Sequence, residues 1–67
     1  MQTYINKDIR EAAIKIYKQY TYRKESAERN MRSYISIGKE IYKNNAIRWT
    51  ALAKQSKAEL VRMMSLA

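Results

Sequence analysis

The chain has 67 residues, enough for one small domain, and contains no Cys, no His, no Pro and a single Gly. The lack of Cys and His excludes disulfides, thiolate metal sites and the commonest general base, and the scarcity of turn-forming residues argues against a β fold. Fourteen Lys and Arg against six Asp and Glu give a net charge of +8, which favours a polyanion or an acidic surface as partner, with solubility alone as the alternative explanation.

The beginning of the chain, MQTYINKDIREAA, carries acidic residues and no apolar segment, so we expect no secretory leader. No apolar run approaches the roughly 20 residues that span a bilayer. We therefore expect a soluble, cytoplasmic protein whose residues 1–67 form a single helical domain. A chain of this length builds a small core, so oligomerisation is an expected source of additional stability.

Apolar residues are spaced as in helices throughout the chain, and the first predicted helix covers about residues 3–20. Its apolar stripe includes Ile9 and Ile16. The next residues, YTYR at 20–23, combine aromatic and β-branched side chains that lower helix propensity, and a charged residue falls on the stripe here. We therefore predict a turn near Thr21.

The second predicted helix covers about residues 24–43, and we place its end at Asn44-Asn45 because Asn tolerates the left-handed conformation that closes many helices. Gly38 lies on the apolar face of this helix. A Gly inside a helix costs about 1 kcal/mol relative to Ala, so we interpret Gly38 as a point where another helix packs closely. A kink at Gly38 is the alternative.

The opposite face of this second predicted helix carries a row of basic and polar residues, namely Arg29, Arg32, Ser36, Lys39 and Lys43. Such a row can follow a phosphate backbone, with Arg binding bidentately and Ser adding a neutral hydrogen bond. We predict that this basic row binds nucleic acid, with Arg29 and Arg32 meeting base edges if the helix enters the major groove of DNA. The alternative is a solvated face, since Glu25, Glu28 and Glu40 are spaced to pair with these cations.

The third predicted helix, about residues 46–66, has two apolar stripes. One contains Trp49, Leu52, Ala53, Ser56, Leu60 and Met63, and the other contains Ile47, Ala51, Ala58 and Val61. A helix that is apolar on two sides is usually sandwiched, so we predict that the second stripe contacts another copy of the chain or a partner protein. A capping-box pattern at Ser56–Glu59 leaves open a division into two shorter helices meeting at Gln55-Ser56.

Residues 46–60, AIRWTALAKQSKAEL, loosely resemble a helix-turn-helix segment. In that resemblance Leu52-Ala53 would end one helix and Ser56 would open the next, although Gln55 stands where a turn Gly is usual. In size, charge and lack of catalytic residues the chain is similar to small phage or mobile-element accessory proteins.

Tyrosines are the last signal, and five of the six cluster between residues 17 and 42: Tyr17, Tyr20, Tyr22, Tyr34 and Tyr42. Tyrosine can stack on bases or anchor a protein interface, but in a chain without Phe it also fills the core. We expect Tyr34 and Tyr42 to be core residues and Tyr22 to be exposed.

Together these patterns predict an all-α, small three-helix domain, with a helical hairpin or a long-helix homodimer as structural alternatives. We expect a non-enzymatic regulatory or accessory protein that binds nucleic acid through the basic row. The alternative is a protein–protein adaptor or inhibitor that acts through the C-terminal helix and the tyrosines. We expect no cofactor, no metal, no membrane partner and no small-molecule substrate.

Overall fold

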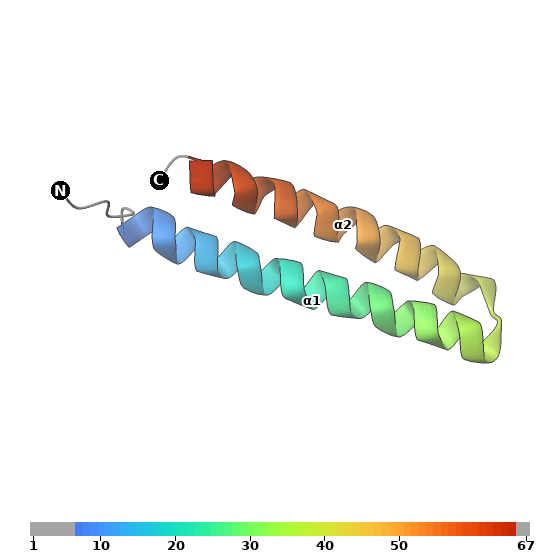
Figure 1. Cartoon of the computed structure of the whole chain (residues 1–67). Coiled ribbons are helices and arrows are strands. Elements are labelled where there is room, and N and C mark those ends of the chain that lie inside the picture. The colour runs from blue at the N-terminus through green and yellow to red at the C-terminus, as the bar shows by residue number, and fades with distance from the viewer. Residues whose placement is uncertain (1–6, 66–67) are drawn as a thin grey trace.

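The structure, a computed structural model, describes residues 7–65 as two long antiparallel helices (Figure 1). Helix α1 covers Lys7–Ile37, helix α2 covers Glu40–Ser65, and Gly38-Lys39 connects them. No strand occurs among the described residues, so the all-α prediction is confirmed. Residues 3–6 of the first predicted helix and residue 66 of the third lie outside the described residues.

The predicted three-helix arrangement is wrong, and the described residues form a helical hairpin, one of its stated alternatives. No turn occurs at Thr21, where α1 continues and the Thr21 hydroxyl donates a hydrogen bond to the Tyr17 carbonyl oxygen at 3.0 Å. That bond keeps the hydroxyl inside the helix. The low propensity of a few β-branched and aromatic residues costs a few tenths of a kcal/mol each, less than the packing against α2 supplies.

The chain turns at Gly38, and the predicted break at Asn44-Asn45 is also wrong, since both Asn residues lie inside α2. Gly38 has a φ of +81°, and its amide donates to the Tyr34 carbonyl oxygen at 2.7 Å, which closes α1 with a left-handed cap. A Cβ built on Gly38 would meet nothing within 4 Å. Gly38 is therefore required by its backbone conformation, and its interpretation as a close-packing point or kink is wrong.

Helix α2 runs through Gln55-Ser56 without interruption, so neither the two-helix division nor the helix-turn-helix resemblance of residues 46–60 corresponds to a turn in the structure. The first apolar stripe of the third predicted helix does face α1. Its members are buried or half-buried: Trp49, Leu52, Ala53, Ser56, Leu60 and Met63. The stripe keeps its phase because α2 is one helix.

The contact between the helices follows a heptad repeat. On α1, Ile9, Ile16, Arg23 and Asn30 are half-buried at seven-residue spacing, and on α2 Tyr42, Trp49, Ser56 and Met63 are buried or half-buried at the same spacing. A repeat of seven keeps two long helices in continuous contact. The buried residues of the described part are all small, namely Ser26, Ala27, Ala46, Ala53 and Ser56, so the backbones can approach closely.

Polar side chains are part of this contact. The Arg23 guanidinium donates to the Leu52 carbonyl oxygen at 3.0 Å and to the Ser56 Oγ at 2.9 Å. The Ser56 hydroxyl donates in turn to the Gln19 Oε1 at 3.1 Å. Among the described residues no buried side-chain polar atom lacks a partner. The charge of Arg23, which the sequence suggested would force a turn, is accommodated by these hydrogen bonds.

The hairpin is a rod of 55 × 15 × 13 Å with a radius of gyration of 15.6 Å, whereas a compact chain of this length has about 11 Å. Its accessible surface is 5608 Å², against about 4,500 Å² for a compact 8.0-kDa protein. Two helices therefore leave uncovered a surface that a third layer would cover. Within the described part of the chain, neither helix is both long and apolar enough to cross a membrane.

Candidate nucleic-acid interface

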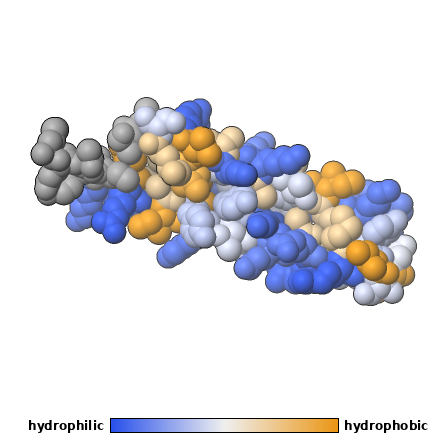
Figure 2. Space-filling model, in the orientation of Figure 1, coloured by the Kyte–Doolittle hydropathy of each residue, from blue (hydrophilic) through white to orange (hydrophobic). Residues whose placement is uncertain are grey.

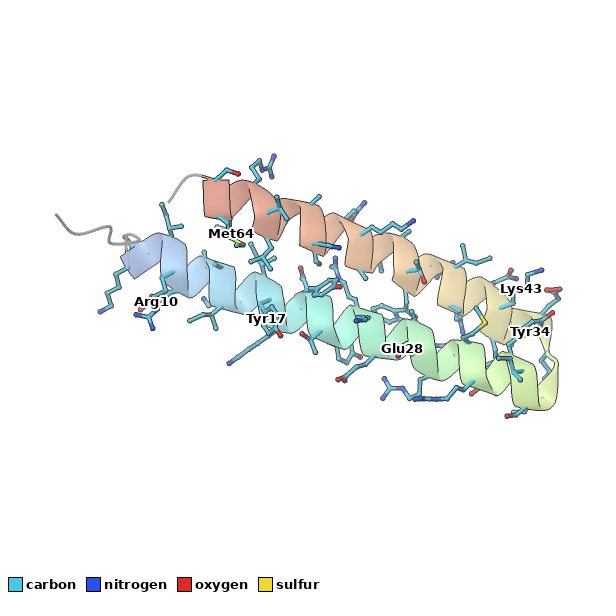
Figure 3. The ribbon with its side chains drawn as sticks, viewed as in Figure 1. Arg10, Tyr17, Glu28, Tyr34, Lys43 and Met64 are labelled. Atoms are coloured by element: carbon cyan, nitrogen blue, oxygen red, sulfur yellow. The ribbon has the colours of Figure 1, made fainter. Side chains whose placement is uncertain are left out.

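The turn end of the hairpin carries the predicted basic row, but on three different elements. Arg29, Arg32 and Ser36 lie on α1, Lys39 is in the connection and Lys43 belongs to the first turns of α2. All five side chains are exposed. Figure 3 places Lys43 beside Tyr34 at the turn end, far from Arg10 at the other end of the rod. The prediction that these five residues share one helical face is therefore wrong, because the chain reverses at Gly38.

The α1 part of the row is interleaved with acidic residues. Glu25, Glu28, Arg29 and Arg32 line a shallow hollow of about 370 Å³ on α1. Two carboxylates balance two guanidinium groups here, and the Arg29 Nη2 also donates to the Ser26 Oγ at 3.2 Å. Glu40 stands between Lys39 and Lys43 in the sequence, so the four cations of the row and their three neighbouring carboxylates leave a net charge of +1, located towards the connection.

The positive charge of the whole molecule lies almost entirely at its surface. Of the fourteen basic side chains, Arg23 is half-buried and every other one is exposed. Among the basic side chains of residues 7–65, only Arg23 donates hydrogen bonds from one helix to the other. The net charge of +8 therefore contributes little to holding the hairpin together and is available to a partner.

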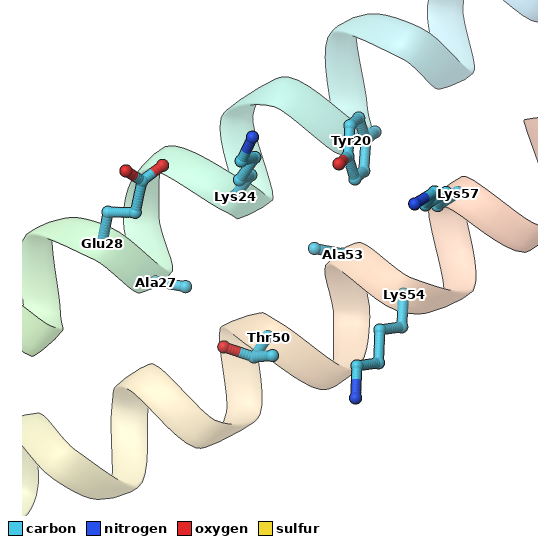
Figure 4. A pocket seen from close by; sticks show the side chains of 8 residues that line it. All are labelled: Tyr20, Lys24, Ala27, Glu28, Thr50, Ala53, Lys54 and Lys57. Atoms are coloured by element: carbon cyan, nitrogen blue, oxygen red, sulfur yellow. The ribbon is translucent and has the colours of Figure 1, made fainter.

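A second cationic cluster was missed by sequence reasoning. Lys24 of α1 and Lys54 and Lys57 of α2 line one groove between the helices, of about 270 Å³ (Figure 4). The other lining residues are Tyr20, Ala27, Glu28, Thr50 and Ala53. From the sequence, Lys54 was visible as an interruption of an apolar stripe, but its proximity to Lys24 depends on the register that the turn at Gly38 sets.

The second apolar stripe of α2, predicted as an interface, is uncovered in the hairpin. Ile47, Ala51, Ala58 and Val61 are all exposed, with Ile47 at 58% and Val61 at 54%. Ile47 and Ala51 line a further hollow of about 290 Å³ together with Met31, Ala46, Thr50 and Lys54. The structure thus brings Met31 of α1 into the neighbourhood of this stripe, which the sequence did not indicate.

Some tyrosines lie in the contact between the two helices and others lie at the surface. Tyr20, Tyr34 and Tyr42 are half-buried, whereas Tyr17 and Tyr22 are exposed. Tyr22 lies within α1 and meets Trp49 edge-on, with the ring centroids 5.6 Å apart and an interplanar angle of 86°. Tyr22 is thus exposed as expected, although it lies in a helix and not at a turn, and one side of its ring is occupied.

Within residues 7–65 there is no group of three or more His, Cys, Asp or Glu side chains that could hold a metal ion. Comparisons with protein-family models, with curated proteins and with solved structures find no significant match to this chain. The chemistry of the surfaces is therefore the basis on which a function can be proposed.

Proposed function

We propose that this chain is a small, non-enzymatic regulatory or accessory protein that binds nucleic acid through the basic residues around its turn end, Arg29, Arg32, Ser36, Lys39 and Lys43. The observation that carries the proposal is the exposure of every basic side chain except Arg23 in a molecule of net charge +8. Exposed Lys and Arg side chains bind phosphates by releasing condensed counterions. Lys39 and Lys43 on either side of the start of α2 would supply most of the local attraction, because Glu25 and Glu28 offset Arg29 and Arg32, whereas Glu40 is the single carboxylate between the two lysines.

The test is a titration of fluorescent duplex DNA, single-stranded DNA and RNA at low and moderate salt. Binding should weaken steeply with salt, and the double variant Arg32→Ala with Lys39→Ala should reduce the slope of log K against log salt by about 2 for duplex DNA. The matched control is Arg10→Ala with Lys15→Ala, which removes the same charge far from the turn. Equal slopes for both variants would show diffuse attraction, and absence of binding at low salt would exclude the proposed function.

A second candidate function is a protein–protein adaptor or inhibitor that uses α2 and the tyrosines. It is favoured by the exposure of Ile47 and Val61 on a helix whose other side already packs against α1. The partner can be a second copy, which would make a homodimer, or another protein. Sedimentation of the wild type and of Val61→Glu separates the two, since a homodimer through this stripe should dissociate in the variant and a monomer should remain unchanged.

A further inference from the structure

One side of the hairpin has a continuous groove between the helices. The hollow that contains Lys24 and the hollow that contains Met31 share Thr50 and Lys54 as lining residues, so they adjoin. Along α2 the groove extends from Ala46 to Lys57, about 17 Å of helix. Its lining includes the buried residues Ala27, Ala46 and Ala53, and such small side chains let a third helix approach closely. The groove therefore has the length to receive about three turns of helix.

A seven-residue pattern repeats on both helices, and it includes groove-lining residues and continues one repeat beyond the groove, to Tyr17 on α1 and to Val61 on α2. On α1, Tyr17, Lys24 and Met31 are spaced by seven residues and share a helix face. On α2, the residues with the same spacing on one helix face are Ile47, Lys54 and Val61. The four apolar members are 43–58% exposed, namely Tyr17 57%, Met31 43%, Ile47 58% and Val61 54%. Each helix thus presents apolar residues at the two ends and a lysine in the middle.

Figure 2 shows hydrophobic patches near both ends of one face of the rod, with hydrophilic surface between and around them. At the middle, Lys24, Lys54 and Lys57 line the groove together with a single carboxylate, that of Glu28, so the lining carries a net positive charge. Figure 4 shows the Lys24 and Lys54 side chains at the two outer edges of the groove, pointing away from each other.

A second copy of the chain is a poor occupant of this groove. If two hairpins overlapped along their whole length, the middle of one groove would lie on the middle of the other. Three lysines of each copy would then meet with one glutamate from each, in two molecules that each carry +8. Like charges brought together in an interface cost several kcal/mol. Nucleic acid would satisfy the lysines but leave the four apolar side chains in water.

A helix with acidic residues at its middle and apolar residues at its ends would complement both the lysines and the apolar side chains. We propose that the groove docks an amphipathic helix of another protein, with carboxylates on its middle turns and large apolar side chains about two turns to either side. The surface of the lone hairpin exceeds that of a compact protein of its mass by about 1,100 Å², and a stable interface needs about 800 Å² per partner. This inference rests on the second candidate function, the adaptor role, and identifies its surface and partner class.

The test uses displayed helical peptides of about 18 residues, with Leu at the outer contact positions and randomised central contact positions. Selection against the full chain should enrich Asp and Glu at the centre. A selected acidic peptide, labelled for fluorescence anisotropy, should bind at least about tenfold more weakly to the variant Lys54→Glu with Lys57→Glu. Selection against that variant should instead enrich Lys and Arg. The control, Lys15→Glu with Lys18→Glu on α1, makes the same charge change and should alter the affinity by less than about threefold.

Circular dichroism of each variant checks that the helices persist. Peptides with no acidic preference, or binding that is insensitive to the lysine variant, would overturn this inference and leave an adaptor role intact. Failure to select any helical binder would overturn both. The inference is also overturned if sedimentation shows a dimer that Met31→Glu dissociates, or if the Lys54 and Lys57 variant loses duplex DNA binding while Arg32→Ala with Lys39→Ala retains it.

Discussion

At the scale of single residues, the least ordinary feature is a hydrogen-bonded network in the middle of a helix–helix contact. Ser56 is 1% exposed, accepts from Arg23 and donates to Gln19. Polar residues at such positions reduce stability compared with apolar ones but fix the register of paired helices. In this hairpin, the network holds Gln19 and Arg23 of α1 against residues 52–56 of α2.

The network makes a prediction about coupling between residues. Ser56→Ala removes one acceptor of Arg23 and the donor to Gln19, so it should lower the free energy of unfolding by about 1–2 kcal/mol. Adding Arg23→Leu should recover at least about half of that loss, because it removes the guanidinium group that Ser56→Ala leaves without its hydroxyl acceptor. Urea denaturation of the two single variants and the double variant measures this coupling. Additive effects would mean that Arg23 and Ser56 act independently.

At the scale of the helices, the apolar stripes could be predicted from the sequence but the breaks could not. Periodicity identifies Ile9, Ile16 and Trp49 as contact residues, and the structure buries or half-buries each of them. Propensity placed turns at Thr21 and Asn44, yet a few tenths of a kcal/mol per residue cannot end a helix that continues to pack. The turn at Gly38 is different, because its φ of +81° is a backbone conformation that Gly adopts freely and that other residues adopt only at an energetic cost.

The candidate sites also differed in how far they could be predicted from the sequence. The exposure of Arg29, Arg32 and Ser36 was predictable from their shared helix face. The groove flanked by Lys24 and Lys54 was not, because those residues are distant in sequence and meet only after the hairpin register is set. A site on one helix can be seen in a periodic pattern, whereas a site between two helices requires their pairing.

The continuity of α2 can be tested at Gln55, the exposed position at which a helix-turn-helix would turn. In a continuous helix, Gln55→Gly should cost about 1 kcal/mol of unfolding free energy relative to Gln55→Ala. At a true turn, Gly would be neutral or favourable. Thermal denaturation of the two variants gives the comparison, and a Gly variant at least as stable as the Ala variant would contradict one uninterrupted helix.

At the scale of the whole molecule, charge opposes folding. The chain carries a net charge of +8 on a rod only 15 × 13 Å across, and its buried residues are all small, so repulsion acts on a structure with little apolar burial. Salt screens charges that are separated by more than about 10 Å at 0.1 M. We therefore expect salt to stabilise the free protein while it weakens nucleic-acid binding, and these opposite signs distinguish the two effects.

Raising NaCl from about 20 mM to about 500 mM should increase the stability of the free chain by about 1 kcal/mol, or Tm by about 4–8 °C for a chain of this size. The variant Lys7→Glu with Lys15→Glu lowers the net charge without touching the turn end or the groove, so its Tm should rise less over the same salt range. Differential scanning calorimetry at several salt concentrations measures both proteins. A wild-type Tm that falls with salt would show that attractive ion pairs, and not repulsion among the exposed cations, dominate the electrostatics of the hairpin.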